Sequence, residues 1–314
     1  MRAMVQIVTT PGSGEGRASS TARRLLRALT RRGYVASIQT FADLAALERW
    51  AQTCGPSMTH LVAVGGDATL SATATAAIRL AVPFVPVPSG FGNIFAAAFG
   101  HGSQTGRVID LFEHGEVRSV DVGAAGGGDV FLSHRSYGML EAIQRAVEAG
   151  RAQPRQRLRR HLAYYATARR YVLGAPLPSV RVEVDGQVVA GDAAVVTVAN
   201  VETYRGFLSL TPAASPVDGL FDVCAIPRAA KPVFWLRLFK LLLGSASRWD
   251  GLVRCRGRRA RVTVAGAPPE ELSVRRGVLR LLVPPGSIER LEARQAAAER
   301  AESPAPVIER RGAA

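Results

Sequence analysis

Apolar runs of strand length alternate with stretches of helical length over the first 117 residues. Strands and helices that alternate at this spacing are typical of a parallel sheet covered by helices on both faces, and ligands bind at the carboxyl ends of its strands. The sequence therefore predicts a doubly wound α/β domain at 1–117. Its expected strands are 4–9, 35–41, 61–64 and 84–87, and its expected helices include 20–32 and 43–53.

The pattern changes at about residue 118, where helices give way to short strands separated by turns. Asp185 and Gly186 stand between two alternating runs, which indicates a tight β-hairpin. We expect a second, mainly antiparallel and β-sandwich-like domain at 118–288, followed by a charged helix and a disordered tail at 289–314. The expected strands of the second domain are 119–124, 130–133, 180–184, 188–190 and 194–199.

Two helices of the second domain have an unusual composition. The segment 154–173 mixes apolar residues with six arginines, so it could pack on a sheet or lie on an anionic bilayer, and packing is the safer prediction. The segment 232–243 is apolar over a broad arc but too short to span a membrane. It is either a core helix or an interfacial anchor beside a basic run.

Two consecutive strands of the first domain each end in a glycine loop that opens a helix. Adjacent glycines allow a tight turn and the close approach of a ligand, while the first N–H groups of the helix point outward beside the positive end of its dipole. Such a corner suits a phosphate, although one loop alone would equally suit a connection without a ligand. The loops consist of Gly65, Gly66, Asp67, Ala68 and Thr69, and of Gly90, Phe91, Gly92 and Asn93.

Composition and charge narrow the classes of partner. The 314 residues are enough for two domains with separate cores, and 47% hydrophobic with 21% charged residues is ordinary for a globular protein. The formal net charge of +15 comes chiefly from arginine and attracts phospholipid, nucleotide or nucleic acid alike. No RNP-like aromatic pattern, zinc-finger spacing or basic leucine zipper is present, so we expect no specific nucleic-acid partner.

Cysteine usage and hydropathy bear on location. Cys54, Cys224 and Cys255 are scattered, without the spacing of a zinc site or a disulfide framework, which fits reduced thiols in a cytoplasm. The N-terminus lacks a signal-peptide pattern, and no apolar run approaches about eighteen residues. We therefore expect a cytoplasmic protein that does not span a membrane.

The order and spacing of the glycine loops resemble the diacylglycerol kinase family of lipid kinases, which is related to sphingosine kinases and NAD kinases. In that family the loops read Gly-Gly-Asp-Gly-Thr and Gly-Thr-Gly-Asn, so Ala68 replaces a glycine and Phe91 a threonine. An earlier loop containing Ser13 and Gly14 matches a third family loop, Asn-Pro-x-Ser-Gly, with Thr10 in place of the asparagine. The resemblance implies that all three loops bind ATP and that Asp67, expected on an exposed loop, acts in catalysis near the metal or the transferred phosphate.

The resemblance continues into the second domain. Asn200, the following Tyr204-Arg205-Gly206 and the turn after Asp218 match family motifs. In the family this turn can hold Mg²⁺ through a carboxylate and main-chain carbonyls, which implies Ser215, Asp218 and Leu220 as ligands here. Only Asp218 supplies a charge, and a single carboxylate makes a weak magnesium site. An ordinary Asp-Gly turn without a metal remains the alternative.

The catalytic base of the family is missing. It is the aspartate of an Asp-Gly-Glu turn, which corresponds here to Ala265-Gly266-Ala267. Glu270 and Glu271 lie a few residues further on and are the remaining candidates for a base. Loss of a general base lowers a rate by about a hundredfold to ten-thousandfold, so the sequence predicts a weakened or inactive kinase.

Three functions are compatible with these motifs. The first is ATP-dependent phosphorylation of a lipid hydroxyl such as that of diacylglycerol, with Mg²⁺, in phospholipid biosynthesis. The second is non-catalytic binding of nucleotide or lipid on the same fold, and the third is NAD kinase, which shares only the first glycine loop. The resemblance implies a lipid substrate at an anionic membrane surface, reached from the cytoplasm at the inner face, and leaves a homodimer open. It also slightly favours partial exposure of 232–243.

Overall fold

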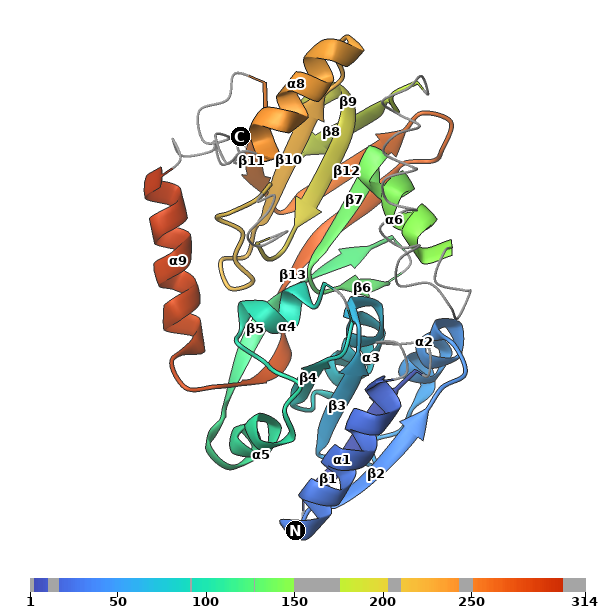
Figure 1. Ribbon diagram of the computed structural model, residues 1–314, viewed down its shortest axis with the longest axis vertical. Helices are drawn as coiled ribbons and strands as arrows, with labels where there is room; N and C mark the ends of the chain where they lie inside the picture. The colour runs from blue at the N-terminus through green and yellow to red at the C-terminus, as the bar shows by residue number, and fades with distance from the viewer. Residues whose placement is uncertain are drawn as a thin grey trace, which may run out of the picture.

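The structure is a computed structural model that describes residues 3–10, 17–90, 92–126, 128–149, 176–202, 210–242 and 251–301 (Figure 1). Within these ranges the strands form one 13-stranded sheet, with the order β11-β10-β9-β8-β12-β13-β4-β3-β1-β2 and with β5, β6 and β7 paired beside this path. The parallel strands at one end and the antiparallel strands at the other correspond to the two predicted domains.

The N-terminal part is the predicted doubly wound α/β fold. Apolar residues alternate along β3, so that Leu61 and Ala63 face α2 and α3 while Val62 and Val64 face α1 and α5. Helices therefore cover both faces of the parallel strands. Its strands are β1 (Met4–Thr9), β2 (Val35–Thr40), β3 (His60–Gly65) and β4 (Phe84–Pro88), and its helices are α1 (Arg17–Arg31), α2 (Leu44–Thr53), α3 (Asp67–Leu80), α4 (Ile94–Ala98) and α5 (Thr105–His114).

The C-terminal part is mainly antiparallel, as predicted. The expected hairpin joins β8 to β9, where Asp185 and Gly186 have φ angles of 48° and 86°, the left-handed pair that a two-residue hairpin needs. Two helices, α6 and α8, cover one face of the long strand β9. The elements are β5 (Glu116–Ala125), β6 (Val130–Phe131), β7 (His134–Gly138), α6 (Met139–Ala149), β8 (Val180–Val184), β9 (Gln187–Ala199), β10 (Phe221–Pro227), α8 (Lys231–Leu242), β11 (Val253–Gly257), β12 (Arg259–Val264), β13 (Glu270–Val283) and α9 (Ser287–Ala301).

The long strand β13 connects the two parts. It begins in the antiparallel region beside β12, continues along β5 and reaches β4, where Leu281 pairs with Phe84. Leu279, Leu281 and Val283 are buried in the same core as α2 and α3. The end of the chain therefore completes the N-terminal core, although the sequence pattern assigned these residues to the second domain.

Of the two segments with unusual composition, the structure describes the apolar one, which forms most of α8 at the surface of the C-terminal part. In α8, Phe234 is fully buried, whereas Val233 and Leu236 are 44% and 55% exposed. The predicted partial exposure is thus confirmed for 231–236, the part of the helix whose side chains are described. The predicted charged helix is α9. The basic segment 154–173 and the tail after 301 lie outside the described residues. Of the helices that the structure describes, none is both long and apolar enough to cross a membrane.

Candidate functional site

The two glycine loops lie against each other at the carboxyl ends of β3 and β4. The strands are parallel neighbours, paired up to Gly65 and Pro88, and the N–H of Ser89 donates to the carbonyl of Gly65 at 2.8 Å. A Cβ added to Gly90 would lie 2.7 Å from the Cα of Gly66. The two backbones are thus in direct contact, and a side chain at position 90 would force them apart.

Asn93 holds the second loop in shape. Its φ of 49° places it in the left-handed region, which few residues other than glycine enter readily. Its side-chain oxygen accepts from the N–H of Gly90 at 2.8 Å, and its side-chain nitrogen donates to the carbonyl of Gly90 at 2.7 Å. This pair of bonds closes the loop immediately before α4, so that the first N–H groups of that helix face the first loop.

Asp67 links the two loops, and the prediction of an exposed position for it was wrong. It is the first residue of α3 and is partly buried. Burial raises the pKa of its carboxyl group, and the N–H groups of Asn93, Phe95 and Ile94 oppose this rise without cancelling it. Its Oδ1 is buried and has no hydrogen-bond partner among the described residues. A buried carboxylate oxygen without a partner is costly and marks a position where a ligand would supply one.

The residues after Asp67 belong to α3. Ala68 is in the first helical turn and is not among the described residues with positive φ, so this position does not need the glycine of the family motif. Thr69 is buried, and its hydroxyl lies 3.0 Å from that of Thr10, which connects the first glycine loop to the loop after β1. The remaining predicted nucleotide ligands, Ser13, Gly14 and Phe91, lie outside the described residues.

Of the predicted magnesium ligands, Asp218 pairs with an arginine, Arg256. The Oδ1 of Asp218 accepts from the N–H of Leu220 at 2.9 Å. Its Oδ2 accepts from Nε2 of Gln295 at 2.8 Å and forms an ion pair with Arg256. Burial raises the pKa of Asp218, and Arg256 counteracts this rise. The hydroxyl of Ser215 is buried without a partner in the described part of the chain.

These residues do not fit a magnesium ion. Asp218 supplies the only charge of the predicted ligand set, and both of its oxygens already accept hydrogen bonds. One of the donors is a guanidinium, which repels a second cation. Burial lowers the pKa of Arg256, but Asp222, Asp218 and Glu299 outweigh this effect and raise it, so the arginine stays charged.

Two buried polar residues, Asp121 and Asn200, join β5 to neighbouring segments of the C-terminal part. The sequence motifs pointed to Asn200 but not to Asp121. Asp121 accepts from the N–H of Gly219 and from that of Gly277, both at 2.7 Å. Asn200 donates to the carbonyls of Asp121 and Leu132, both at 3.0 Å, and its side-chain oxygen is buried without a partner in the described ranges. In the sequence, Asp121 could have been noticed as a carboxylate within the otherwise mainly apolar strand 119–124.

The turn that corresponds to the catalytic Asp-Gly-Glu of the family is present without its carboxylates. Ala265, Gly266 and Ala267 form the hairpin between β12 and β13, with Gly266 at φ 82° and the N–H of Ala267 bonded to the carbonyl of Val264 at 2.9 Å. Glycine is thus retained for the turn conformation, and alanine occupies both flanking positions.

The side chains of Glu270 and Glu271 contact residues outside the glycine loops. The hydroxyl of Tyr137 donates to Oε2 of Glu270 at 2.8 Å, and burial together with this bond raises the pKa of Tyr137 above its usual range. Glu271 forms an ion pair with Arg261, to which it is paired across the strands. The contacts of the described residues therefore join neither glutamate to the glycine loops.

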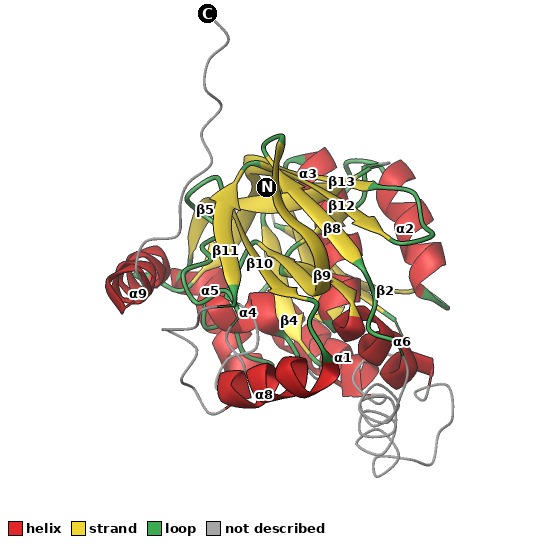
Figure 2. Cartoon of the chain, turned by 90° about the horizontal axis from the view of Figure 1, so that it is seen from above, coloured by secondary structure: helices red, strands yellow, loops and turns green. Residues whose placement is uncertain are grey.

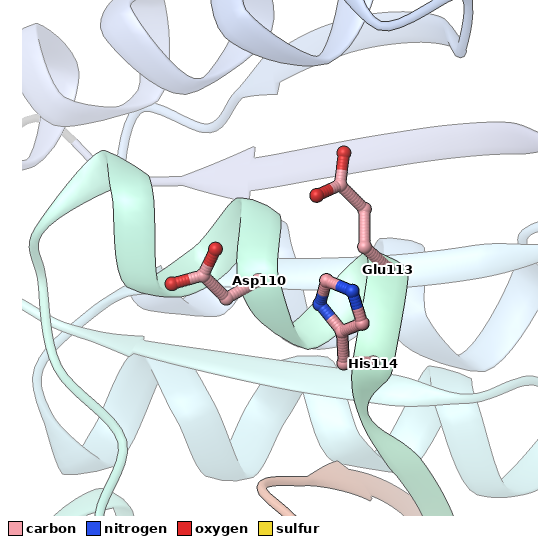
Figure 3. Close-up of side chains that lie close together, drawn as sticks. All are labelled: Asp110, Glu113 and His114. Atoms are coloured by element: carbon pink, nitrogen blue, oxygen red, sulfur yellow. The ribbon is translucent and has the colours of Figure 1, made fainter.

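A second group of possible metal ligands lies on α5. Figure 3 shows Asp110, Glu113 and His114 side by side, and their ligand atoms are within 4.8 Å of one another. All three are exposed, and Glu113 already pairs with Arg32. The adjacent Phe112 contacts Tyr34 and His60 near the amino ends of β2 and β3. This group therefore lies at the edge of the sheet opposite to the glycine loops.

Known proteins resemble this chain over nearly its whole length. Family models for the diacylglycerol kinase catalytic domain and for the YegS C-terminal NAD kinase beta sandwich-like domain match residues 4–125 and 138–275. The diacylglycerol kinase of Bacillus subtilis (strain 168) is 24% identical over 230 residues, which cover 68% of this chain and 74% of that protein.

Solved structures share the fold. A crystal structure of a diacylglycerol kinase from Bacillus anthracis str. Sterne superposes with a TM-score of 0.64 and 17% identity, over 91% of this chain and 98% of that one. A crystal structure of a candidate diacylglycerol kinase from the same strain gives a TM-score of 0.68 and 20% identity, over 90% and 98%. At this identity the likeness establishes the two-part architecture.

Proposed function

Since the chain belongs to the diacylglycerol kinase catalytic-domain family, we propose that it is a lipid kinase that transfers a phosphoryl group from ATP to a lipid hydroxyl such as that of diacylglycerol. The observation that carries the proposal is the contact between the glycine loops. Gly66 and Gly90 touch, and Asp67 of the first loop faces the N–H groups that open α4. Two helix starts converge on one corner, which is the arrangement that binds phosphates.

We propose a role for each residue of this corner. The main chain of Gly65, Gly66, Gly90 and Gly92 allows the phosphates of ATP to approach, and Asn93 fixes the second loop in the required shape. Thr69 anchors the first loop to the loop that contains Ser13 and Gly14. Asp67 lies between the two loops and faces the N–H groups that open α4, so we assign it the catalytic role of orienting the reacting phosphate. Phosphoryl transfer depends mainly on such positioning.

The lipid would be approached at an anionic membrane surface. The exposed Val233 and Leu236 of α8 provide an apolar face, and the net charge of +15 attracts anionic lipid. We propose that the protein works from the cytoplasm as a peripheral protein on the inner face of the membrane.

A second function has a specific observation in its favour. The hairpin at Ala265–Ala267 has no carboxylate, and Glu270 is held by Tyr137. A non-catalytic nucleotide- or lipid-binding protein on the same fold would keep the glycine loops and lose these groups. For a kinase, the same observation predicts slow transfer.

Two measurements separate these functions. The first is a titration of ATP into the protein without lipid, and the second is the transfer of labelled phosphate from ATP to mixed lipid vesicles containing diacylglycerol. The kinase predicts both ATP binding and slow transfer to a lipid. ATP binding without transfer would support the non-catalytic alternative, and absence of ATP binding would refute the proposed site.

A further inference from the structure

Arg256, near the end of β11, is surrounded by three carboxylates. Its guanidinium pairs with Asp218, with Asp222 at 3.3 Å through Nε, and with Glu299 at 2.8 Å through Nη1. The side chains of Arg256, Asp218 and Asp222 are only 12%, 17% and 11% exposed. All three nitrogens of one guanidinium are thus used in a largely buried site. The five N–H donors of arginine, held in a planar fork, suit several carboxylates at once.

These four residues come from two strands, a turn and a helix. Strand pairing places Arg256 directly opposite Asp222 of β10. Asp218 lies in the turn that precedes β10, and its carboxylate also accepts from Leu220 and Gln295. Glu299 and Gln295 belong to α9 and contact each other at 3.1 Å. The arginine therefore connects a sheet, a turn and the C-terminal helix.

The helix α9 contacts both parts of the molecule. At its start, Ser287 donates to the carbonyl of Phe99 at 3.3 Å, and Leu291 lies in the core shared with α2 and α3. Towards its end, Gln295 and Glu299 reach Asp218 and Arg256 in the antiparallel part. Figure 1 shows α9 running alongside the molecule from the region of β5 towards β11, and Figure 2 shows that it lies outside the sheet.

We propose that Arg256 is a built-in cation that occupies the place of a metal ion at the Asp218 turn and, through Glu299 and Gln295, fastens α9 across the two parts of the protein. A metal at this turn would need the Asp218 carboxylate, which the arginine and Gln295 already use. The positive charge that holds the turn is therefore supplied by the chain itself. These contacts stabilise the folded chain whether or not it has kinase activity.

Thermal unfolding of the full chain without nucleotide tests the first half of the proposal. The melting temperature of the wild type should be the same in EDTA and in millimolar MgCl₂. The variant Arg256→Gln should melt about 5 to 10 °C lower, because it leaves buried carboxylates without their counter-charge. MgCl₂ should restore part of this loss, since the vacated site then presents oxygens without a cation.

Matched variants make the outcomes decisive. Arg258→Gln removes an exposed arginine two residues away and should melt like the wild type. The proposal is overturned if Arg256→Gln melts like Arg258→Gln. It is also overturned if MgCl₂ stabilises the wild type and Asp218→Asn abolishes that stabilisation.

Hydrogen exchange tests the second half, including the case in which Arg256→Gln does not fold. Glu299→Gln removes the charge that α9 presents to Arg256 and leaves Asp218 and Asp222 paired with the arginine, while Gln295 can still contact Asp218. Exchange in 287–301 should rise at least severalfold in this variant, with little change in β10 and β11. Unchanged exchange in α9 would show that Arg256 does not fasten it.

Discussion

Replacing Gly90 with alanine should separate the two glycine loops and weaken ATP binding. The added Cβ would lie 2.7 Å from the Cα of Gly66, about 0.7 Å closer than the 3.4 Å at which ordinary contact begins. The obstructing atom belongs to the backbone, so no rotamer change can relieve the clash. One loop must move by a large fraction of an ångström.

The size of the effect follows from this displacement. Overpacking of this kind costs about 1 to 3 kcal/mol, and we expect the lower half of that range because both residues lie in loops. A shift of about 1 Å in a positioned group can reduce a rate about a hundredfold. We therefore expect ATP affinity to fall tenfold or more and lipid phosphorylation to fall by about a hundredfold.

Calorimetric titration measures the affinity for ATP, thermal unfolding measures the loss of stability, and transfer of labelled phosphate to diacylglycerol vesicles measures the rate. Gly55→Ala is the matched control, because a Cβ at that glycine would meet nothing within 4 Å. It should bind ATP and melt like the wild type. If the Gly90→Ala variant binds ATP with the same affinity as the Gly55→Ala variant, the proposed site at the contact of the two loops is refuted.

Substitutions at three further positions test neighbouring parts of the account. Asp67→Asn should abolish transfer without lowering the melting temperature, since the raised pKa shows that the site disfavours the charge. Asp67→Ala should cost about 1 kcal/mol by leaving N–H groups of α4 unpaired, and an equal loss of stability in both variants would contradict this. Ala68→Gly should leave ATP affinity unchanged, because position 68 has no positive φ, and tighter binding would show a need for glycine. His101→Phe should reduce acid sensitivity. Burial lowers the pKa of His101 to about 3, so the folded state loses about 1.4 kcal/mol per pH unit as pH falls from about 6.5 towards 3. The variant should unfold at lower pH than the control His114→Gln, and identical acid unfolding would refute the assignment.

The sequence was sufficient to predict the parallel strands and the position of the glycine loops. Both features depend on local signals: apolar runs such as 61–64 give the strands, and Gly65-Gly66 gives the turn. Neighbouring parallel strands then bring their carboxyl ends together, which places Gly66 next to Gly90. The hairpin at Asp185-Gly186 was predictable for the same reason, since its turn conformation depends only on those two residues.

The side-chain directions could not be predicted from local signals. The environment of Asp67 depends on the N–H groups of Asn93, Ile94 and Phe95, which a separate loop supplies. The partners of Asp218 are still more distant along the sequence, because Arg256 lies in β11 and Gln295 in α9. A motif specifies which residue occupies a position, but the long-range packing decides whether its carboxylate is available to a metal.

The most direct test of the lipid kinase account is phosphate transfer from labelled ATP to diacylglycerol vesicles by three proteins. These are the wild type, Asp67→Asn, and a double variant, Ala265→Asp with Ala267→Glu. The account predicts slow transfer by the wild type, none by Asp67→Asn, and an increase of about a hundredfold or more in the double variant, because the missing base is restored. Absence of transfer by all three proteins, while the wild type binds ATP, would contradict it.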